Sequence, residues 1–452
     1  MINYKKLAKD EAKNATVALQ KFVQINSVYD EGTAKAGQPF GEGVKKALDY
    51  FAKLGGDYGF SVDKCDGYCT ELSIGEEGPL IGIYGHSDVV PVSGKWEHPE
   101  FGGEVKDGRM WGRGTCDDKG PLLASLYAVK ALKDRGLIKG FRVKIVSGGD
   151  EERGSSCLAY YFNKHKGEEP SLGFTPDANW PLIYAEKGIR RYQAVRICNL
   201  SPIIAMDGGV VSNAVCDKMV VTVKKDLALE KFLEGQKDLC DVMASDELDV
   251  LSFKGKSAHG STPEKGINAA LKGFETLGLF YKNDFLIGLA KALKDPFGRS
   301  FDGYNHSAEL GDTTYNYGIV KYDGRSFKLS IDFRFGEEAD PDNLIHHLET
   351  ATGLVCSKMS EAPVLLFDKK SPLVSTLLQA YKRGAHKLVA KPLAIGGGTY
   401  AKEAKNTVAF GAEWEGHSGN MHASDEYLYL DDFEKDIAIY ARAVLMLGKV
   451  AK

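Results

Sequence analysis

The chain has 452 residues, of which 43% are hydrophobic and 27% are charged, and its formal net charge is −4. This composition is typical of a soluble globular protein, and the nearly balanced charge gives no reason to expect nucleic acid or a membrane surface as a partner. The length exceeds what one hydrophobic core usually serves, which favours two domains.

The N-terminal residues lack the unbroken apolar segment of a secretory signal. The longest late apolar stretch, residues 437–447, is interrupted by Arg442, so no run reaches the ~18 residues that a transmembrane helix needs. The eight cysteines form no C-x-x-C pair, and the spacing of Cys65 and Cys69 is only a weak zinc signal. We therefore expect a cytoplasmic protein with reduced thiols.

The first part of the chain alternates between helical and strand-like patterns. Apolar spacing predicts a helix within the first 30 residues and a second one over residues 44–54 that ends at Gly55-Gly56. Two apolar runs, residues 80–84 and 141–146, indicate strands, and a helix is predicted between them over 121–135. This order predicts an α/β layer with a mixed sheet and helices on both faces.

The middle of the chain has a different pattern. Strand-like runs at 192–197, 219–223 and 327–333 are mixed with predicted helices at 227–243 and 266–279, which indicates an inserted α+β domain. The final segment returns to a helix at 373–388, a strand at 407–410 and a helix at 432–447, with Asp431 or Asp432 as its N-cap. We therefore assign residues 1–186 and 368–452 to one domain and residues 187–367 to the inserted domain.

Two predicted strands stop at polar clusters. Residues 80–84 run into Gly85-His86-Ser87-Asp88, and residues 141–146 run into Gly148-Gly149-Asp150-Glu151-Glu152. Open α/β sheets bind ligands beyond the carboxyl ends of their strands, so His86 and the Glu151-Glu152 pair are candidates to meet in space. Either cluster alone would more often be a solvated loop.

Three further clusters strengthen the case for a metal site. They are WGRGTCDDKG at 111–120, TPD at 175–177 and HASDEY at 422–427. Two histidines with several carboxylates form a mixed nitrogen and oxygen ligand set, which suits zinc, manganese or cobalt better than calcium. The set is also large enough for two metals that share a bridging carboxylate, about 3.5–4 Å apart.

Together with further motifs, these clusters resemble those of a known family. Its motifs are GHSDVVPV (85–92), WGRGTCDDKGP (111–121), GGDEERG (148–154), TPDA (175–178), SAHGSTPEKGINA (257–269), GGGTYAK (396–402) and MHASDEY (421–427). Seven motifs in this order resemble the co-catalytic metallopeptidases that include carnosinase, aminoacylase and acetylornithine deacetylase, and among them the peptidase V-like dipeptidases. The resemblance implies a zinc-exopeptidase-like catalytic domain with an inserted lid domain.

The resemblance implies a role for each matching residue of the first domain. His86 and Asp177 would bind one divalent metal, Glu152 and His422 a second, and Asp117 would bridge the two; zinc is the first expectation, with manganese or cobalt as alternatives. Asp88 would accept the second N–H of the His86 imidazole. Glu151 would be the general base, which takes a proton from the attacking water and passes it to the leaving amine. The peptide bond between Asp117 and Asp118 would be cis.

The inserted domain would supply the substrate contacts. His259 resembles the histidine that binds the oxyanion, Asn213 would add a polar contact, and Arg334 would grip the substrate carboxylate. Backbone amides of Gly396, Gly397, Gly398 and Thr399 would help to bind the same group. This chain has Cys216 after Asn213, and Phe335 and Gly336 after Arg334, where relatives often have proline, so the match of Asn213 is the weaker one.

Several alternatives stay open at this level. His417 is a rival to His422 as a ligand, although the H-x-x-D-E spacing favours His422. The predicted activity is hydrolysis of free dipeptides by a monomer whose large lid serves its own active site. An N-acyl-amino-acid deacylase would use the same metals and base, and a non-catalytic peptide-binding homologue would retain only the fold.

Overall fold

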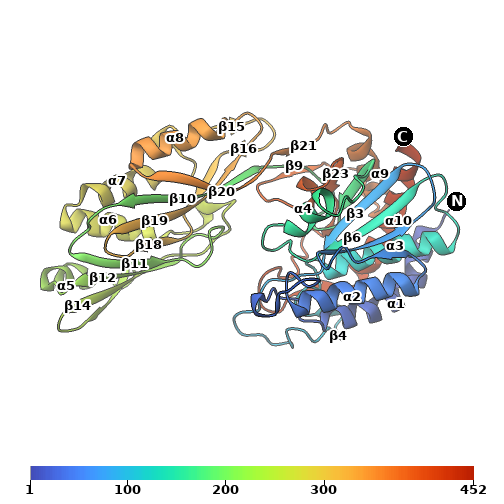
Figure 1. The fold of residues 1–452 in the computed structure, drawn as a ribbon, viewed down its shortest axis with the longest axis horizontal. Helices are drawn as coiled ribbons and strands as arrows, with labels where there is room; N and C mark the ends of the chain where they lie inside the picture. The colour runs from blue at the N-terminus through green and yellow to red at the C-terminus, as the bar shows by residue number, and fades with distance from the viewer. Residues whose placement is uncertain (1, 452) are drawn as a thin grey trace. The chain divides into compact units, whose positions relative to one another are not determined.

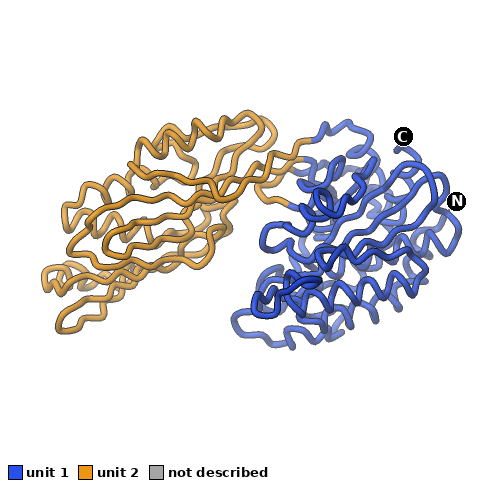
Figure 2. The backbone as a smooth tube through the Cα atoms, viewed as in Figure 1, with its two compact units in different colours: residues 1–184, 367–393, 399–452 blue, residues 185–366, 394–398 orange. Residues whose placement is uncertain are grey.

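The computed structural model describes residues 2–451, and the chain forms two compact units (Figure 2). The first unit contains residues 1–184, 367–393 and 399–452, and the second contains residues 185–366 and 394–398. The chain therefore leaves the first unit twice, the second time only for a short glycine-rich segment. Within residues 2–451, none of the helices is both long and apolar enough to cross a lipid bilayer.

The first unit is built on a mixed sheet with strand order β1-β2-β6-β3-β7-β23-β9, to which β21 (Leu365–Leu366) and β22 (Leu393–Ile395) each add by pairing with β9. The four central strands β6, β3, β7 and β23 run parallel to one another, whereas β1, β2 and β9 pair antiparallel. The strands are β1 (Ser61–Asp63), β2 (Cys69–Ile74), β3 (Leu80–His86), β6 (Arg142–Gly148), β7 (Leu172–Thr175), β9 (Ile183–Glu186) and β23 (Thr407–Ala409).

Helices cover both faces of this sheet (Figure 1). Tyr84 on β3 packs into a core with side chains of α2 and α4. The next residue, Gly85, points to the opposite face, where an added Cβ would lie 3.1 Å from a methyl carbon of Leu122 on α3. The helices are α1 (Tyr4–Val23), α2 (Glu42–Asp57), α3 (Lys119–Asp134), α4 (Ser156–Asn163), α9 (Pro372–Gly384) and α10 (Leu430–Val450). The predicted α/β layer is confirmed.

Two predicted helix ends were wrong. Helix α2 continues through Gly55-Gly56 to Asp57, because Gly55 faces strand β2, where a Cβ would lie 2.2 Å from a methyl carbon of Leu72. Helix α10 begins at Leu430 with Tyr429 as its N-cap. The predicted cap Asp432 lies in the first turn instead, and its carboxylate pairs with His417.

Three short strands of the first unit form a separate small sheet in the order β25-β5-β4. They are β4 (Glu104–Lys106), β5 (Arg109–Trp111) and β25 (Tyr427–Tyr429). This sheet joins segments more than 300 residues apart, since Tyr427 lies opposite Trp111. It therefore places the 111–120 loop beside the 421–427 motif.

The second unit is an antiparallel sheet with helices, as expected for an α+β domain (Figure 1). Its strand order is β13-β14-β12-β11-β18-β19-β10-β20, and β17 also pairs with β19. The strands are β10 (Gly188–Ile197), β11 (Ile203–Gly208), β12 (Lys218–Lys224), β13 (Cys240–Ala244), β14 (Leu248–Lys254), β17 (Thr314–Asn316), β18 (Val320–Tyr322), β19 (Ser326–Phe335) and β20 (Val355–Ala362). The helices are α5 (Leu227–Leu233), α6 (Ala269–Tyr281), α7 (Asp284–Leu293) and α8 (Pro341–Thr352).

The single helix predicted over residues 227–243 was wrong. Helix α5 ends at Leu233, and Gly235 follows with a left-handed φ of +84°, which glycine adopts without steric cost. The chain then reverses, and Cys240–Ala244 forms strand β13 against β14, with Val242 opposite Leu251. Edge pairing and burial of Cys240 thus override the helical spacing of this segment.

Candidate active site

The carboxyl ends of three parallel strands meet at one edge of the first unit's sheet. Strand β3 ends at His86, which lies opposite Gly148 at the end of β6, and β7 runs parallel to β3 on its other side. The residues that follow these strands include Glu151, Glu152 and Asp177. The parallel arrangement therefore gathers three of the sequence motifs at the place where open α/β sheets bind ligands.

The Asp117 carboxylate lies between two imidazoles. One oxygen, Oδ1, lies 3.0 Å from Nε2 of His86, and the other, Oδ2, lies 2.8 Å from Nε2 of His422. Nε2 of His86 also lies 3.6 Å from Oδ2 of Asp177, and Nε2 of His422 lies 3.1 Å from Oε1 of Glu152. The structure thus brings together all five residues that the sequence predicts as metal ligands.

Glu151 lies within the same cluster. One potential ligand atom from each of His86, Glu151 and Asp177 lies within 4.8 Å of the others, and the same holds for His86, Asp117 and Glu152. His86 is shared by the two groups, so they are adjacent.

The protonation of His86 shows that the cluster fits a bound cation. Nδ1 of His86 lies 3.0 Å from the backbone carbonyl of Asp88, and because a carbonyl only accepts, Nδ1 carries a proton. A neutral ring then directs the lone pair of Nε2 at carboxylate oxygens of Asp117 and Asp177, which are also acceptors. Either a proton on Nε2 or a cation must lie between these atoms, and a divalent metal ion with nitrogen and oxygen ligands fits this place.

The electrostatics of the acidic residues support the same fit. Burial, together with repulsion from Asp117, raises the pKa of Asp177 to about 7. Burial and then repulsion from Asp177 raise the pKa of Glu151 well above its usual range. Burial opposes a charge on His422, but the Asp117 and Glu152 carboxylates outweigh it and raise the His422 pKa to about 11. The site therefore carries an excess of negative charge that protons compensate when no metal is bound.

Asp88 contacts both His86 and the loop of the two glutamates. Nδ1 of His86 lies 3.0 Å from the backbone carbonyl of Asp88 and 3.5 Å from its nearest carboxylate oxygen. The two carboxylate oxygens also accept the backbone N–H groups of Glu151 and Glu152, each at 3.1 Å. Asp88 therefore holds the loop that presents both glutamates.

The loop that carries Asp117 is held by Glu426, a residue to which the sequence assigns no role. Oε1 of the buried Glu426 accepts the backbone N–H groups of Gly114 and Cys116, each at 3.0 Å, and of Asp117 at 3.3 Å. Oε2 lies 2.6 Å from Nη1 of Arg113. The position of Glu426 in the HASDEY motif was visible in the sequence, but a buried carboxylate cannot be told there from a solvated one.

The residue after Asp117 is also part of this scaffold. The peptide bond between Asp117 and Asp118 is cis, as the family resemblance predicts. Oδ2 of the buried Asp118 accepts the backbone N–H of His86 at 3.1 Å. An added Cβ at Gly85 would lie 2.4 Å from the same oxygen, which explains why glycine precedes His86.

His417, the rival ligand, lies outside the cluster. Its Nδ1 pairs with the carboxylate of Asp432 at the start of α10. Its ring also contacts the ring of Tyr429, with centroids 4.2 Å apart. These partners account for His417, whereas His422 directs Nε2 at Asp117 and Glu152.

The second unit brings the segments of Asn213 and His259 together. Gly260 N–H donates to the Asn213 carbonyl at 2.7 Å, and Ala214 pairs with His259 in an isolated antiparallel bridge. The His259 ring contacts the hydroxyl of Ser261, with Nδ1 and Oγ 2.6 Å apart.

Arg334 lies on strand β19 of the second unit, and its buried guanidinium already has protein partners. Nε donates to Asp332 at 2.7 Å, and Nη1 donates to the carbonyl of Gly396 at 2.6 Å. An added Cβ at Gly396 would in turn lie 2.9 Å from the Cβ of Ser261. Arg334, the glycine-rich segment and the His259 loop therefore form one corner of this unit.

The predicted amide-binding segment is divided between the units. Gly397 and Gly398 belong to the second unit, whereas Thr399 belongs to the first. The Thr399 hydroxyl accepts the backbone N–H of Ala401 at 3.2 Å and caps the short helix Tyr400–Lys402.

Comparison with known proteins agrees with the motifs. The profile of Peptidase family M20/M25/M40 matches residues 82–446. The sequence is 33% identical over 449 residues to "Putative dipeptidase YtjP" of Bacillus subtilis (strain 168), covering 95% of this chain and 96% of that protein.

Solved structures share the fold. An M20 family metallo-carboxypeptidase from Sulfolobus solfataricus is similar with a TM-score of 0.60 and 18% identity, over 96% of this chain and 99% of that one. Human carnosine dipeptidase 1 is similar with a TM-score of 0.58 and 15% identity, over 99% of both chains. On the strength of the profile and the bacterial relative, the chain belongs to peptidase family M20/M25/M40.

Proposed function

We propose that this protein is a metal-dependent dipeptidase that hydrolyses the peptide bond of free dipeptides. One observation carries the proposal: two imidazoles flank the Asp117 carboxylate, and each points a ring nitrogen at acidic oxygens. Membership of a peptidase family and the dipeptidase name of the 33% identical relative support the same activity.

The proposed centre holds two divalent cations. His86 and Asp177 would bind the first, Glu152 and His422 the second, and Asp117 would bind both. Zinc is the first choice for this ligand set, and manganese or cobalt would also fit. When bound, such ions polarise the scissile carbonyl and acidify a water molecule.

Glu151 is the proposed general base. Asp88 holds its backbone N–H at 3.1 Å, which fixes the carboxylate beside the ligand cluster. Burial raises the pKa of Glu151, which suits a group that must take a proton from the attacking water and keep it until the leaving nitrogen accepts it.

The second unit is the proposed lid domain. The protein is proposed to be a monomer, in which the lid serves the active site of the same chain. His259 would donate to the oxyanion, with Asn213 as a further polar contact. Arg334 uses part of its five-donor guanidinium on Asp332 and Gly396, so its remaining N–H groups could bind the substrate carboxylate. Amides of Gly397, Gly398 and Thr399 would bind the same carboxylate, which would limit the substrate to two residues.

The decisive assay is amine release from a panel of free dipeptides and the matching N-acetyl amino acids. The protein is stripped of metal and assayed before and after addition of zinc, manganese or cobalt. Cleavage of free dipeptides that returns with metal supports the proposal. Cleavage of acylated compounds alone would reassign the protein as a deacylase, and no cleavage of either class would leave a peptide-binding homologue.

A further inference from the structure

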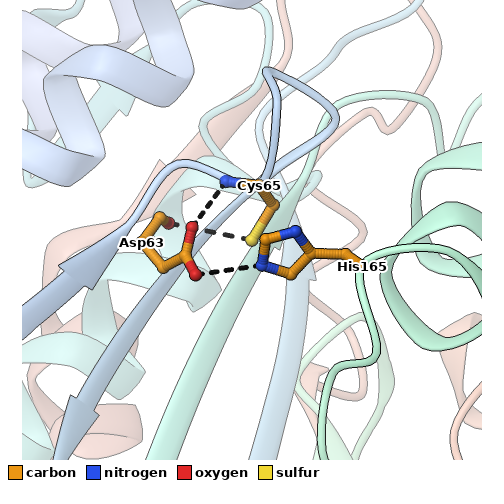
Figure 3. Close-up of side chains that lie close together, drawn as sticks. All are labelled: Asp63, Cys65 and His165. Atoms are coloured by element: carbon orange, nitrogen blue, oxygen red, sulfur yellow. Dashed lines mark hydrogen bonds and ion pairs between the residues drawn. The ribbon is translucent and has the colours of Figure 1, made fainter.

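A second cluster of potential metal ligands lies in the first unit, on residues that take no part in the proposed active site (Figure 3). It consists of Asp63, Cys65 and His165, each of which offers one ligand atom within 4.8 Å of the other two. Oδ2 of Asp63 and Nε2 of His165 are 2.9 Å apart. In Figure 3 the sulfur of Cys65 lies beside the imidazole ring, on the same side as the Asp63 carboxylate.

The backbone holds the first two residues before any ligand binds. Asp63 ends strand β1, where it lies opposite Glu71 of β2. Its Oδ1 accepts the backbone N–H of Cys65 at 2.9 Å, which leaves Oδ2 directed at the histidine. The Cys65 side chain is 1% exposed and belongs to the core between α2 and α4.

His165 is fixed from the opposite side of the cluster. It follows helix α4, and its backbone N–H donates to the carbonyl of Tyr160 at 3.0 Å. Nδ1, the ring nitrogen remote from Asp63, lies 3.9 Å from Oδ2 of Asp66, and that oxygen accepts the hydroxyl of Tyr160 at 2.7 Å. Asp66 therefore places a negative charge near Nδ1, which favours a proton on that nitrogen when Nε2 binds a metal.

The three ligand types select the class of cation. A thiol sulfur, an imidazole nitrogen and one carboxylate oxygen suit zinc and similar thiophilic divalent ions, whereas magnesium and calcium prefer oxygen alone. The side chains of Asp63 and His165 are 52% and 24% exposed, so solvent can reach the cluster and provide a fourth ligand. The same exposure gives the ion a path of entry.

We propose that Asp63, Cys65 and His165 bind one zinc-class divalent cation, separate from the two of the active site, which clips the turn after β1 to the end of α4. Bonds form from the ion to Sγ of Cys65, Nε2 of His165 and Oδ2 of Asp63, and water completes a tetrahedral shell. The thiol proton passes to solvent. The ion replaces the hydrogen bond that His165 Nε2 donates to Asp63, so the Nε2 proton also passes to solvent and Nδ1 carries the ring proton instead. The site does not depend on peptidase activity.

Cadmium titration of the full-length protein tests the proposal, because a cadmium–thiolate bond gives an ultraviolet charge-transfer band. Manganese is first added in excess to occupy the oxygen-rich active site. The wild type is expected to develop the band with one equivalent of cadmium, and zinc should abolish it. Loss of a residue that only hydrogen-bonds a metal ligand weakens metal binding roughly 10–100-fold. Cys65→Ser and His165→Gln each remove a proposed ligand, so each should weaken cadmium binding by more than this. Cys198→Ser, which removes a thiol of the second unit, is the matched control and should keep the band.

Each contrary outcome overturns a defined part of the proposal. A band that survives Cys65→Ser would place the ion on another thiol. A band that survives His165→Gln at unchanged affinity would reduce the site to a single reactive cysteine. No band in the wild type would exclude the site. His165→Gln alters a partly exposed ring, so it keeps the test valid if Cys65→Ser fails to fold.

Discussion

Glu426→Gln is expected to destabilise the first unit and to weaken metal binding. Glu426 is not a proposed ligand, and it contacts the ligand Asp117 through the backbone N–H of that residue. The wild-type carboxylate accepts three backbone N–H groups on Oε1 and pairs with Arg113 on Oε2. A glutamine has one oxygen, so its NH₂ group must face either the three N–H groups or the guanidinium. Both orientations set donor against donor in a buried place.

The magnitude follows from these contacts. Removing one partner of a buried ion pair costs about 3–5 kcal/mol, and a hydrogen bond to a charged group contributes roughly 1.5–3 kcal/mol. Because the two estimates describe overlapping contacts, we expect a loss of about 3–5 kcal/mol in the free energy of unfolding of the first unit. The loop of Asp117 loses its anchor at the same time, so the apparent affinity for metal should fall.

Urea unfolding at pH 8, followed by tryptophan fluorescence, measures the first effect. The four tryptophans all belong to the first unit, so the signal reports that unit alone: Trp96, Trp111, Trp180 and Trp414. A metal-competition titration measures the second effect. Glu104→Gln, which removes an exposed partner of His98, is the control and should change stability by no more than about 0.5 kcal/mol. A Glu426→Gln protein with the stability and metal affinity of this control would refute the reasoning.

Three further predictions concern the proposed chemistry. Glu151→Gln should lower kcat for a dipeptide about 10²–10⁴-fold, as expected for loss of a general base, with unchanged metal content by mass spectrometry; a change in metal content would make Glu151 a ligand. Metal-stripped protein should lose thermal stability as the pH rises from 5 to 8. The folded state keeps a proton on Asp177 up to about pH 7, whereas the unfolded chain releases this proton near pH 4, so a rise in pH favours the unfolded chain. Asp177→Asn should flatten that slope, and an equally steep slope in this variant would reject the assignment. His259→Ala should lower kcat about 10²–10³-fold, the cost of one oxyanion donor, whereas metal affinity measured by titration should stay that of the wild type.

The sequence by itself determined the fold class and the family. The alternation of strands and helices before residue 187 predicted the mixed α/β layer because a sheet face and a helix stripe must each bury apolar residues, and this pattern is local. The ordered motifs identified the metallopeptidase family, and the family profile over residues 82–446 agrees. The roles of Glu151 and His259 remain predictions for the experiments above.

Only the tertiary structure decided which polar side chains are buried and which distant residues meet. The sequence does not reveal whether Glu426 is buried or solvated, whereas folding makes its carboxylate the acceptor of three N–H groups in the loop of Asp117. Residues 227–243 have helical spacing, but the residues from Cys240 onward form strand β13 and pair with strand β14. Asp63 and His165 lie 102 positions apart and touch only because β1 and the end of α4 converge. Local sequence patterns report which face of an element is apolar, whereas burial of a charge depends on partners that only the folded chain brings together.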